Sequence, residues 1–176
     1  ERWNVMTIFR ECEELFLGGT MPSFTGPPPF GWIQKIDPQT LEVINETPQL
    51  PCGEHVWCGA IAAHQNGNIL KVNGNYMHSI SSNCEVEIEK KLPIDQAHNG
   101  LLVLSDGSIV TKDLRLEGQG RSTITRLNDK LELLHEPFVL PEGSMGRIAS
   151  DKNDDGEFIY IPGIKKIWKI RADEKF

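Results

Sequence analysis

Short apolar runs separated by polar turns extend along most of the chain, and the pattern returns at intervals of about 45 residues. Four segments read as a strand, a polar turn and a second strand: residues 33–43, 77–86 and 124–133, and a copy that begins at Ile167. Their apolar positions Ile36, Ile80, Leu127 and Ile170 are equivalent. The chain therefore contains an internal repeat, which has to be recognised before any local assignment is made.

A second hairpin keeps the same period. It follows each of three Leu-Pro pairs, at Leu50-Pro51, Leu92-Pro93 and Leu140-Pro141. Its turns contain Asn-Gly or Asp-Gly, within residues 65–68, 105–108 and 153–156. Both dipeptides tolerate positive φ and are strong signals for tight hairpins. Proline has no amide donor, so each Leu-Pro pair ends strand pairing before the next hairpin begins.

Each repeat thus holds four short strands, which is the size of a propeller blade. The sequence predicts an all-β β-propeller with about four visible four-stranded blades, over residues 7–50, 51–92, 93–140 and 141–176. The outer strands are expected to carry the acids Glu85, Glu87, Glu89, Glu132 and Glu136. The last blade has no outer strand of its own. Either the N-terminal strand supplies it, or the blades belong to a larger propeller.

The first blade is less regular than the others. Apolar residues within 7–16 recur at helical spacing, so a short helix competes with a strand, and we expect a strand over residues 4–9. The Pro-rich stretch 20–30 predicts a loop where a regular second strand is due.

Composition and charge narrow the function classes. The chain has 176 residues, 39% of them hydrophobic, and a net charge of -7, which argues against nucleic acid as a partner. No apolar run reaches the ~20 residues that cross a bilayer, and the start shows no signal pattern, so we expect a soluble chain without a membrane partner. Of the four cysteines, Cys52 and Cys58 could pair across a short loop or remain free thiols.

Two segments carry a resemblance to a known superfamily. Asn99-Gly100-Leu101, followed by Asp106-Gly107, Val110 and Asp113, resembles a blade opening of gluconolactonase-like propellers. Gly53-Glu54-His55-Val56-Trp57 is similar to the Gly-Glu-x-x-x-Trp segment of the same proteins. The chain thus resembles the soluble propellers that include the pyrroloquinoline-quinone-type repeat and gluconolactonase/strictosidine-synthase-like proteins.

The resemblance implies a divalent cation in the channel, held by Glu54 and Asn99. Carboxylate and amide oxygens suit a hard cation, calcium above all. The corresponding loop of the fourth blade, Gly143-Ser144-Met145-Gly146, offers no third ligand of this kind. The other interpretation is that Asn99 satisfies backbone groups of its own turn.

Loops at one face of a propeller surround the mouth of its channel, which is a natural ligand site. The candidate ligand-binding residues in these loops are His55, Trp57, Lys112, Asp113, Arg115 and Arg147. We expect a binding scaffold that presents this polar mouth to a small molecule or a protein partner. The alternative is a divalent-cation-dependent, lactonase-like hydrolase, with Glu54 and Asn99 on the ion and His98 or Asp95 as the base.

Overall fold

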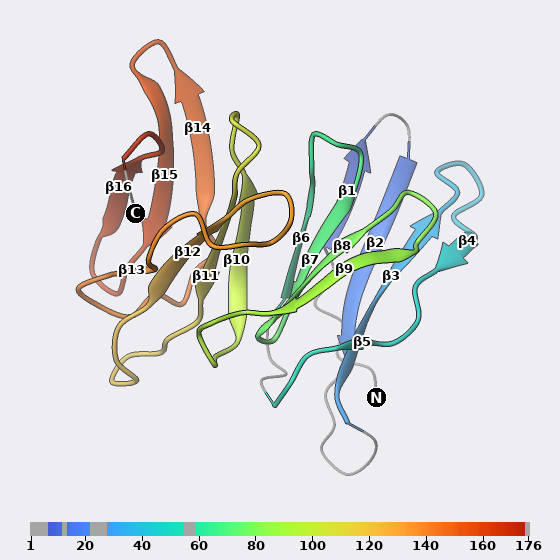
Figure 1. The fold of residues 1–176 in the computed structure, drawn as a ribbon, viewed down its shortest axis with the longest axis horizontal. Coiled ribbons are helices and arrows are strands. Elements are labelled where there is room, and N and C mark those ends of the chain that lie inside the picture. The colour runs from blue at the N-terminus through green and yellow to red at the C-terminus, as the bar shows by residue number, and fades with distance from the viewer. Residues whose placement is uncertain (1–6, 12–13, 22–27, 55–58, 175–176) are drawn as a thin grey trace. The chain divides into compact units, whose positions relative to one another are not determined.

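The computed structural model describes residues 7–11, 14–21, 28–54 and 59–174, and every regular element in these ranges is a β-strand (Figure 1). The strands form four antiparallel sheets, each built from consecutive segments of the chain. The all-β prediction is confirmed. None of the described segments forms a helix with the length and apolarity needed to cross a membrane.

The chain divides into two units, and the first, Glu1–Ala97, contains two sheets. Sheet A holds β1 (Thr7–Glu11), β2 (Glu14–Met21), β3 (Phe30–Ile36), β4 (Val43–Glu46) and the short β5 (Leu50–Pro51), which also pairs with β3. Sheet B holds β6 (Gly59–Ala63), β7 (Ile69–Asn73), β8 (Tyr76–Ile80) and β9 (Val86–Lys91). Strands β6 to β8 lie mostly buried, whereas β9 alternates half-buried and exposed residues.

The second unit, His98–Phe176, also contains two sheets. Sheet C holds β10 (His98–Val103), β11 (Ile109–Asp113), β12 (Thr123–Leu127) and β13 (Phe138–Val139). Sheet D holds β14 (Ala149–Asn153), β15 (Gly156–Pro162) and β16 (Ile167–Arg171). Among the described residues sheet D has three strands, in agreement with the expected lack of an outer strand in the last repeat.

The tight Asn-Gly and Asp-Gly turns, within residues 65–68, 105–108 and 153–156, lie where the sequence predicts them. Gly67, Gly107 and Gly156 all have positive φ, at 89°, 83° and 129°. Side-chain oxygens close the same turns: Asp106 Oδ1 accepts a 2.8 Å hydrogen bond from the Ser108 N–H, and Asn153 Oδ1 accepts one of 2.9 Å from the Asp155 N–H. Glycine and Asx residues therefore fix the hairpin geometry in both units.

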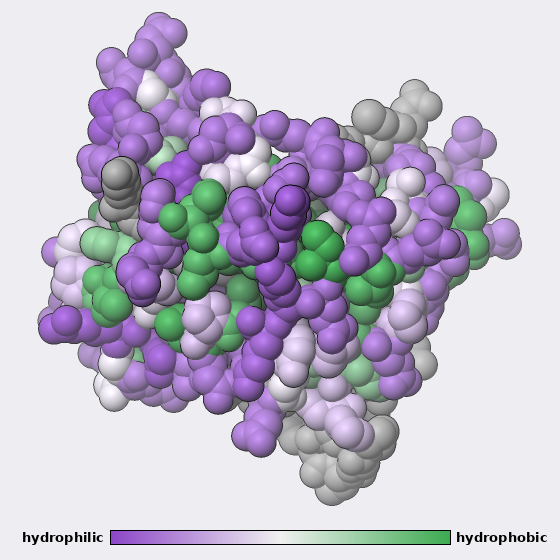
Figure 2. Space-filling model, viewed as in Figure 1, coloured by the Kyte–Doolittle hydropathy of each residue, from purple (hydrophilic) through white to green (hydrophobic). Residues whose placement is uncertain are grey.

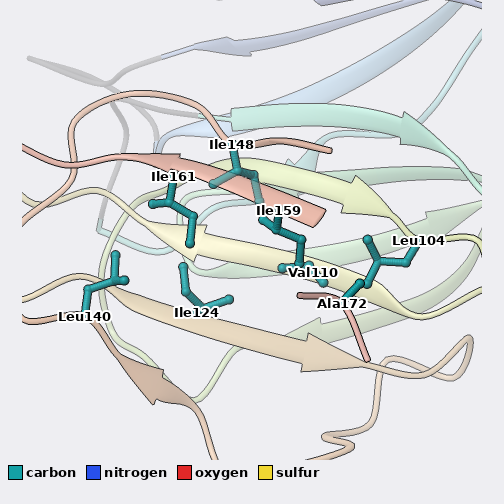
Figure 3. Close-up of a cluster of buried hydrophobic side chains, with 8 residues drawn as sticks. All are labelled: Leu104, Val110, Ile124, Leu140, Ile148, Ile159, Ile161 and Ala172. Atoms are coloured by element: carbon teal, nitrogen blue, oxygen red, sulfur yellow. The ribbon is translucent and has the colours of Figure 1, made fainter. Parts of the chain in front are cut away.

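Each unit is held by its own apolar cluster. In the first unit it comprises Phe16, Ile33, Leu50, Ile61, Ile69, Ile80 and Cys84. In the second unit it comprises Leu104, Val110, Ile124, Leu140, Ile148, Ile159, Ile161 and Ala172 (Figure 3). Val110 and Ile124 come from sheet C, Ile159 and Ile161 come from sheet D, and the other four residues lie directly beside strands of these sheets, so burial of apolar surface joins the two sheets. Arg126 adds a polar link, because its Nη1 donates to the Ala172 carbonyl at 2.6 Å.

Three local expectations need correction or completion. The helical alternative for residues 7–16 is wrong, because the described residues 7–11 and 14–16 pair as β1 and β2, and β2 continues to Met21, into the stretch expected to be a loop. The acidic outer strand expected around Glu132 and Glu136 is also wrong: β13 is Phe138–Val139. Pro137 lies directly before it and cannot donate to a ladder, so pairing starts only after this residue.

The surface in view is mainly polar, and the described cysteines are free thiols. Hydrophilic side chains cover most of the face in Figure 2, with apolar patches between them. Leu133, Leu134, Phe138 and Val139 are among the exposed apolar residues. Cys52 and Cys84 are free and buried, so Cys52 forms no disulfide, and burial raises the pKa of the Cys52 thiol to about 11. Cys12 and Cys58 lie outside the residues whose side chains are described.

Candidate functional site

The second unit brings half of the predicted site residues to one end of sheet C. His98 and Asn99 begin β10, and Lys112 and Asp113 end β11. Because β10 and β11 are antiparallel, the start of one lies beside the end of the other: His98 is opposite Asp113, and Gly100 is opposite Lys112. The register shifts between His98 and Gly100, which makes Asn99 the extra residue of a β-bulge. Bulges re-aim a side chain and are common next to functional sites.

Asn99 has one satisfied and one unsatisfied end. Its Nδ2 donates to the Met145 carbonyl at 2.6 Å and to the Gly146 carbonyl at 3.4 Å. Its Oδ1 is buried and has no hydrogen-bond partner among the residues that the structure describes. The residue as a whole is 6% exposed, so water reaches it poorly. A buried acceptor without a donor is uncommon in a folded protein and calls for a physical reason.

Asp113 fixes the position of Arg115. Its carboxylate is completely buried and accepts from the Thr123 N–H at 2.5 Å and from Arg115 Nε at 2.8 Å. The Arg115 side chain is 24% exposed, and its Nη1 reaches the Gln119 carbonyl at 3.5 Å. A guanidinium has five N–H donors, and a carboxylate that binds one of them restricts the direction of the rest. Arg115 is therefore a positioned cation at the surface of this strand end.

Lys112 points its ammonium inward. The residue is completely buried, and Nζ donates to the Asp113 and Ser144 carbonyls, each at 2.9 Å. Ser144 is held further by Ser122 Oγ, which accepts its N–H at 2.9 Å, and by the Pro162 carbonyl, which accepts its hydroxyl at 2.6 Å. Lys112 thus anchors the loop whose next two carbonyls bind Asn99. We call Asn99, Lys112, Asp113, Arg115 and Ser144 the strand-end cluster.

The sequence pattern missed the roles of Ser122 and of the Met145 and Gly146 carbonyls. These groups contact the cluster from segments more than 20 residues away, and a backbone acceptor leaves no trace in side-chain identity. Gly146 is a partial signal, because a Cβ there would come within 2.3 Å of Pro162 Cγ. Only glycine allows this close approach.

The other predicted residues are not members of the strand-end cluster or lie outside the described ranges. His98 is completely buried on β10, and Arg147 is exposed. In the first unit, Glu54 is exposed in a turn, and Asp95 accepts from Asn75 Nδ2 at 2.5 Å. His55 and Trp57 lie outside the described residues.

The divalent cation that the resemblance implies, held by Glu54 and Asn99, stays a prediction. Among the described residues no group of three or more His, Cys, Asp or Glu side chains could hold a metal ion. The two implied ligands are divided between the units, with Glu54 in the first and Asn99 in the second. Asn99 Oδ1 is buried without a hydrogen-bond partner among the described residues, and a single amide oxygen does not make a metal site.

At the equivalent end of sheet B, the Asn73 side chain has hydrogen-bond partners at both its oxygen and its nitrogen. Asn73 ends β7 as Asp113 ends β11, and it too is completely buried. Its Oδ1 accepts from Thr20 Oγ1 at 2.8 Å, and its Nδ2 donates to the Leu50 and Pro51 carbonyls at 3.3 and 3.2 Å. The Asn73 side chain is thus satisfied, whereas Asn75, two residues further on, also has a buried Oδ1 without a hydrogen-bond partner among the described residues.

Comparison with known proteins bears on the fold. No family model matches the sequence, and no curated protein matches it. Solved structures do match: a protein of unknown function from Bacteroides caccae has a TM-score of 0.56 at 20% identity over 82% of this chain. The WD40 β-propeller domain of Doa1 has a TM-score of 0.57 at 14% identity over 96%. A catalytically inactive virginiamycin B lyase from Staphylococcus aureus with quinupristin has a TM-score of 0.55 at 14% identity over 99%.

The fold is a β-propeller. The four sheets and the similarity to these structures confirm the predicted fold class. Sequence identities of 14–20% support the fold and no inference about function. The chain spans 55% of the Bacteroides caccae protein's length, 63% of the Doa1 domain and 74% of the lyase.

Proposed function

We propose that this β-propeller is a binding scaffold that takes a small polar ligand at the strand-end cluster of sheet C. The observation that carries the proposal is the buried Oδ1 of Asn99, which lacks a donor among the described residues. Leaving a buried acceptor unsatisfied costs about 1–3 kcal/mol. An O–H or N–H group of a ligand would recover that free energy.

Arg115 supplies the complementary chemistry. Arg115 lies two residues after Asp113, the last residue of β11, and the Asp113 carboxylate orients it. Asp113 is opposite His98, the residue that precedes Asn99. The remaining N–H groups of Arg115 suit a carboxylate or carbonyl oxygen. The ligand class that matches both groups is a small molecule with a hydroxyl or amino group beside a carboxylate, such as a hydroxy acid.

A binding screen with two variants tests the proposal. The probes are a panel of small hydroxycarboxylic acids, followed by ligand-observed NMR. We expect the native protein to bind at least one of them, and Arg115→Gln and Asn99→Leu to weaken that affinity by about tenfold or more, which corresponds to loss of one charge-assisted hydrogen bond.

The matched control is Arg121→Gln, which removes an exposed arginine from the same loop. Circular dichroism of each variant establishes that the fold is retained. An affinity that Arg115→Gln and Arg121→Gln reduce equally contradicts the proposed site, and so does a panel in which nothing binds.

Asn99 Oδ1 also motivates the second candidate function, the cation-dependent lactonase-like hydrolase, because an amide oxygen is a ligand for calcium. A ligand that binds only the folded state raises the thermal midpoint by mass action. On this alternative, millimolar calcium raises the midpoint, and both Asn99→Leu and Glu54→Gln abolish the shift. His98 and Asp95 are then the candidate bases. A midpoint that calcium leaves unchanged eliminates this function and leaves the scaffold.

A further inference from the structure

The fold places the Asn-Gly pairs of the chain in different surroundings. The sequence contains three of them: Asn66-Gly67, Asn73-Gly74 and Asn99-Gly100. In this dipeptide the asparagine side chain reacts readily with the backbone that follows it, because glycine has no Cβ to hinder the approach. Exposure, room and hydrogen bonding then determine which pair reacts in the folded protein.

Asn66-Gly67 lies in the turn that joins β6 to β7, and both residues are exposed (Figure 1). Asn66 Oδ1 accepts a 3.0 Å hydrogen bond from the Asn68 N–H, which folds the amide group back along the backbone that follows it. The nitrogen of Gly67 belongs to this stretch of backbone. A Cβ built on Gly67 meets no atom within 4 Å beyond its chain neighbours, so the described residues leave room for a ring.

The other two pairs are buried. Asn73 is completely buried, and its side chain has hydrogen-bond partners at both its oxygen and its nitrogen. Asn99 is 6% exposed, and a Cβ on Gly100 would lie 2.9 Å from Ile148 Cγ1. The Asn73 amide has to break its hydrogen bonds before it can turn, and a ring has no room beside Gly100.

We propose that Asn66 is a site of spontaneous deamidation, which the fold selects from the three pairs. The Gly67 backbone nitrogen gives up its proton and attacks Asn66 Cγ. A C–N bond forms, and the side-chain amide takes up a proton and leaves as ammonia. Water then opens the resulting five-membered succinimide at either carbonyl. One opening gives aspartate, and the other gives isoaspartate, in which the backbone passes through the former side chain.

One hydrogen bond of the turn opposes the reaction. The Gly67 N–H donates to the His64 carbonyl at 3.0 Å, and this bond has to open before the nitrogen can attack. Opening an exposed turn costs little free energy, whereas opening buried strands costs a large part of the global stability. Each 1.4 kcal/mol of this difference changes the reactive population about tenfold, so Asn66 reacts faster than the buried pairs by about that factor or more.

The two products affect the β6–β7 turn differently. Aspartate keeps a side-chain oxygen for the Asn68 N–H. Isoaspartate adds one carbon to the backbone between residues 66 and 67, inside the loop that the His64 N–H closes by donating to the Asn68 carbonyl at 2.8 Å. Asn68 is also fixed by Ser79 and Glu87, whose oxygens accept from its Nδ2 at 2.9 and 2.6 Å. We therefore expect isoaspartate to disrupt the turn and aspartate to leave it intact.

Peptide mapping by mass spectrometry tests the selection, because trypsin places the three pairs in separate peptides, 36–71, 72–90 and 92–112. The native protein is incubated at mildly alkaline pH, which deprotonates more of the backbone amide, and a parallel sample contains concentrated urea. In the native sample we expect conversion at Asn66 to exceed that at Asn73 and Asn99 by about tenfold or more. In urea the three pairs should convert at similar rates. Conversion at Asn66 no faster than at the buried pairs overturns the proposal, and so does a ratio that urea leaves unchanged.

Two variants test the assignment to Asn66 and the effect on the turn. Asn66→Gln would have to close a six-membered ring, which forms far more slowly, so the isoaspartate of peptide 36–71, detected with a methyltransferase specific for isoaspartyl groups, should disappear. Asn66→Asp reproduces the other product. Hydrogen exchange of the His64 and Gly67 amides should be near native in Asn66→Asp and about tenfold or more faster in the isoaspartate form. Isoaspartate that persists in this peptide of Asn66→Gln overturns the assignment, and equal exchange in the two products contradicts the effect on the turn.

Discussion

Replacing Asp113 with alanine is expected to lower the free energy of unfolding by about 3 kcal/mol, at the lower end of what loss of one partner from a buried ion pair costs. The Asp113 carboxylate is completely buried and accepts from the Thr123 N–H and Arg115 Nε. Without it the buried Thr123 N–H loses its acceptor. Arg115 is 24% exposed, so water compensates part of its loss and keeps the cost from being larger.

Urea unfolding measures this effect, with Asp129→Ala as the control. Asp129 is exposed in a turn, and its removal should change the unfolding free energy by no more than about 0.5 kcal/mol. Asp113→Asn should lie between the two, because an amide keeps an acceptor for Thr123, and Asn73 occupies the equivalent place in sheet B. Equal stability of Asp113→Ala and Asp129→Ala would contradict the assigned role.

The repeat was predictable because its turns depend on local residue chemistry. Gly67, Gly107 and Gly156 provide positive φ directly, and a tight turn needs little from the rest of the chain. The turns within residues 33–43, 77–86 and 124–133 are visibly polar in the sequence, but their conformation is not predictable from it. They place Leu41, Cys84 and Leu131 at φ near +60°, which bulky side chains rarely adopt.

The side chains that close these turns explain why this conformation persists. Asn128 Oδ1 accepts from the Lys130 and Glu132 N–H groups, each at 2.9 Å, and Asp37 Oδ1 accepts from Gln39 and Thr40 at 2.8 and 2.9 Å. These bonds offset the strain of the left-handed residue. The sequence identifies the Asp or Asn that closes each turn. It does not identify the residue that adopts positive φ, because that conformation depends on the hydrogen bonds of the turn.

The candidate site was predictable in its residues but not in their roles. The Asn-Gly-Leu motif and the end of the next strand identified Asn99 and Asp113. The sequence does not distinguish the role of Lys112 from that of the neighbouring charged residues. In the structure its ammonium binds the carbonyl of Ser144, 32 residues further along the chain. A contact of that kind depends on how the loop returns to the sheet, and no local pattern contains it. The β-bulge at Asn99 is likewise a property of the pairing between β10 and β11.

Acid is expected to destabilise the propeller through His78. Burial, together with the positive charge of Lys71 on the neighbouring strand, lowers the pKa of the His78 imidazole to about 4. The ring is 0% exposed and stacks with Tyr76, and Glu89 on the other neighbouring strand approaches Nε2 to 3.4 Å. Glu89 favours the protonated form, but it lies at the exposed edge and does not outweigh the desolvation of a buried cation.

His78 binds a proton at a higher pH in the unfolded chain than in the folded protein. Above pH ~6.5 the imidazole is neutral in both the folded and the unfolded chain, so His78 contributes no pH dependence. Between about pH 6.5 and 4 the unfolded chain binds a proton that the folded chain does not. Stability therefore falls as the pH falls through this window, and the total loss from His78 is about 3 kcal/mol.

His78→Phe isolates this contribution, because it keeps an aromatic ring beside Tyr76 and removes the titrating group. Urea unfolding at a series of pH values should show that the variant loses less stability than the native protein between pH ~6.5 and ~4. Other groups, carboxylates above all, titrate in both proteins, so the difference between the two curves reports His78 alone. His135 is exposed, and His135→Phe should leave the native slope unchanged. If His78→Phe follows the native curve instead, the imidazole is protonated in the folded state over this range, and Glu89 rather than burial controls its charge.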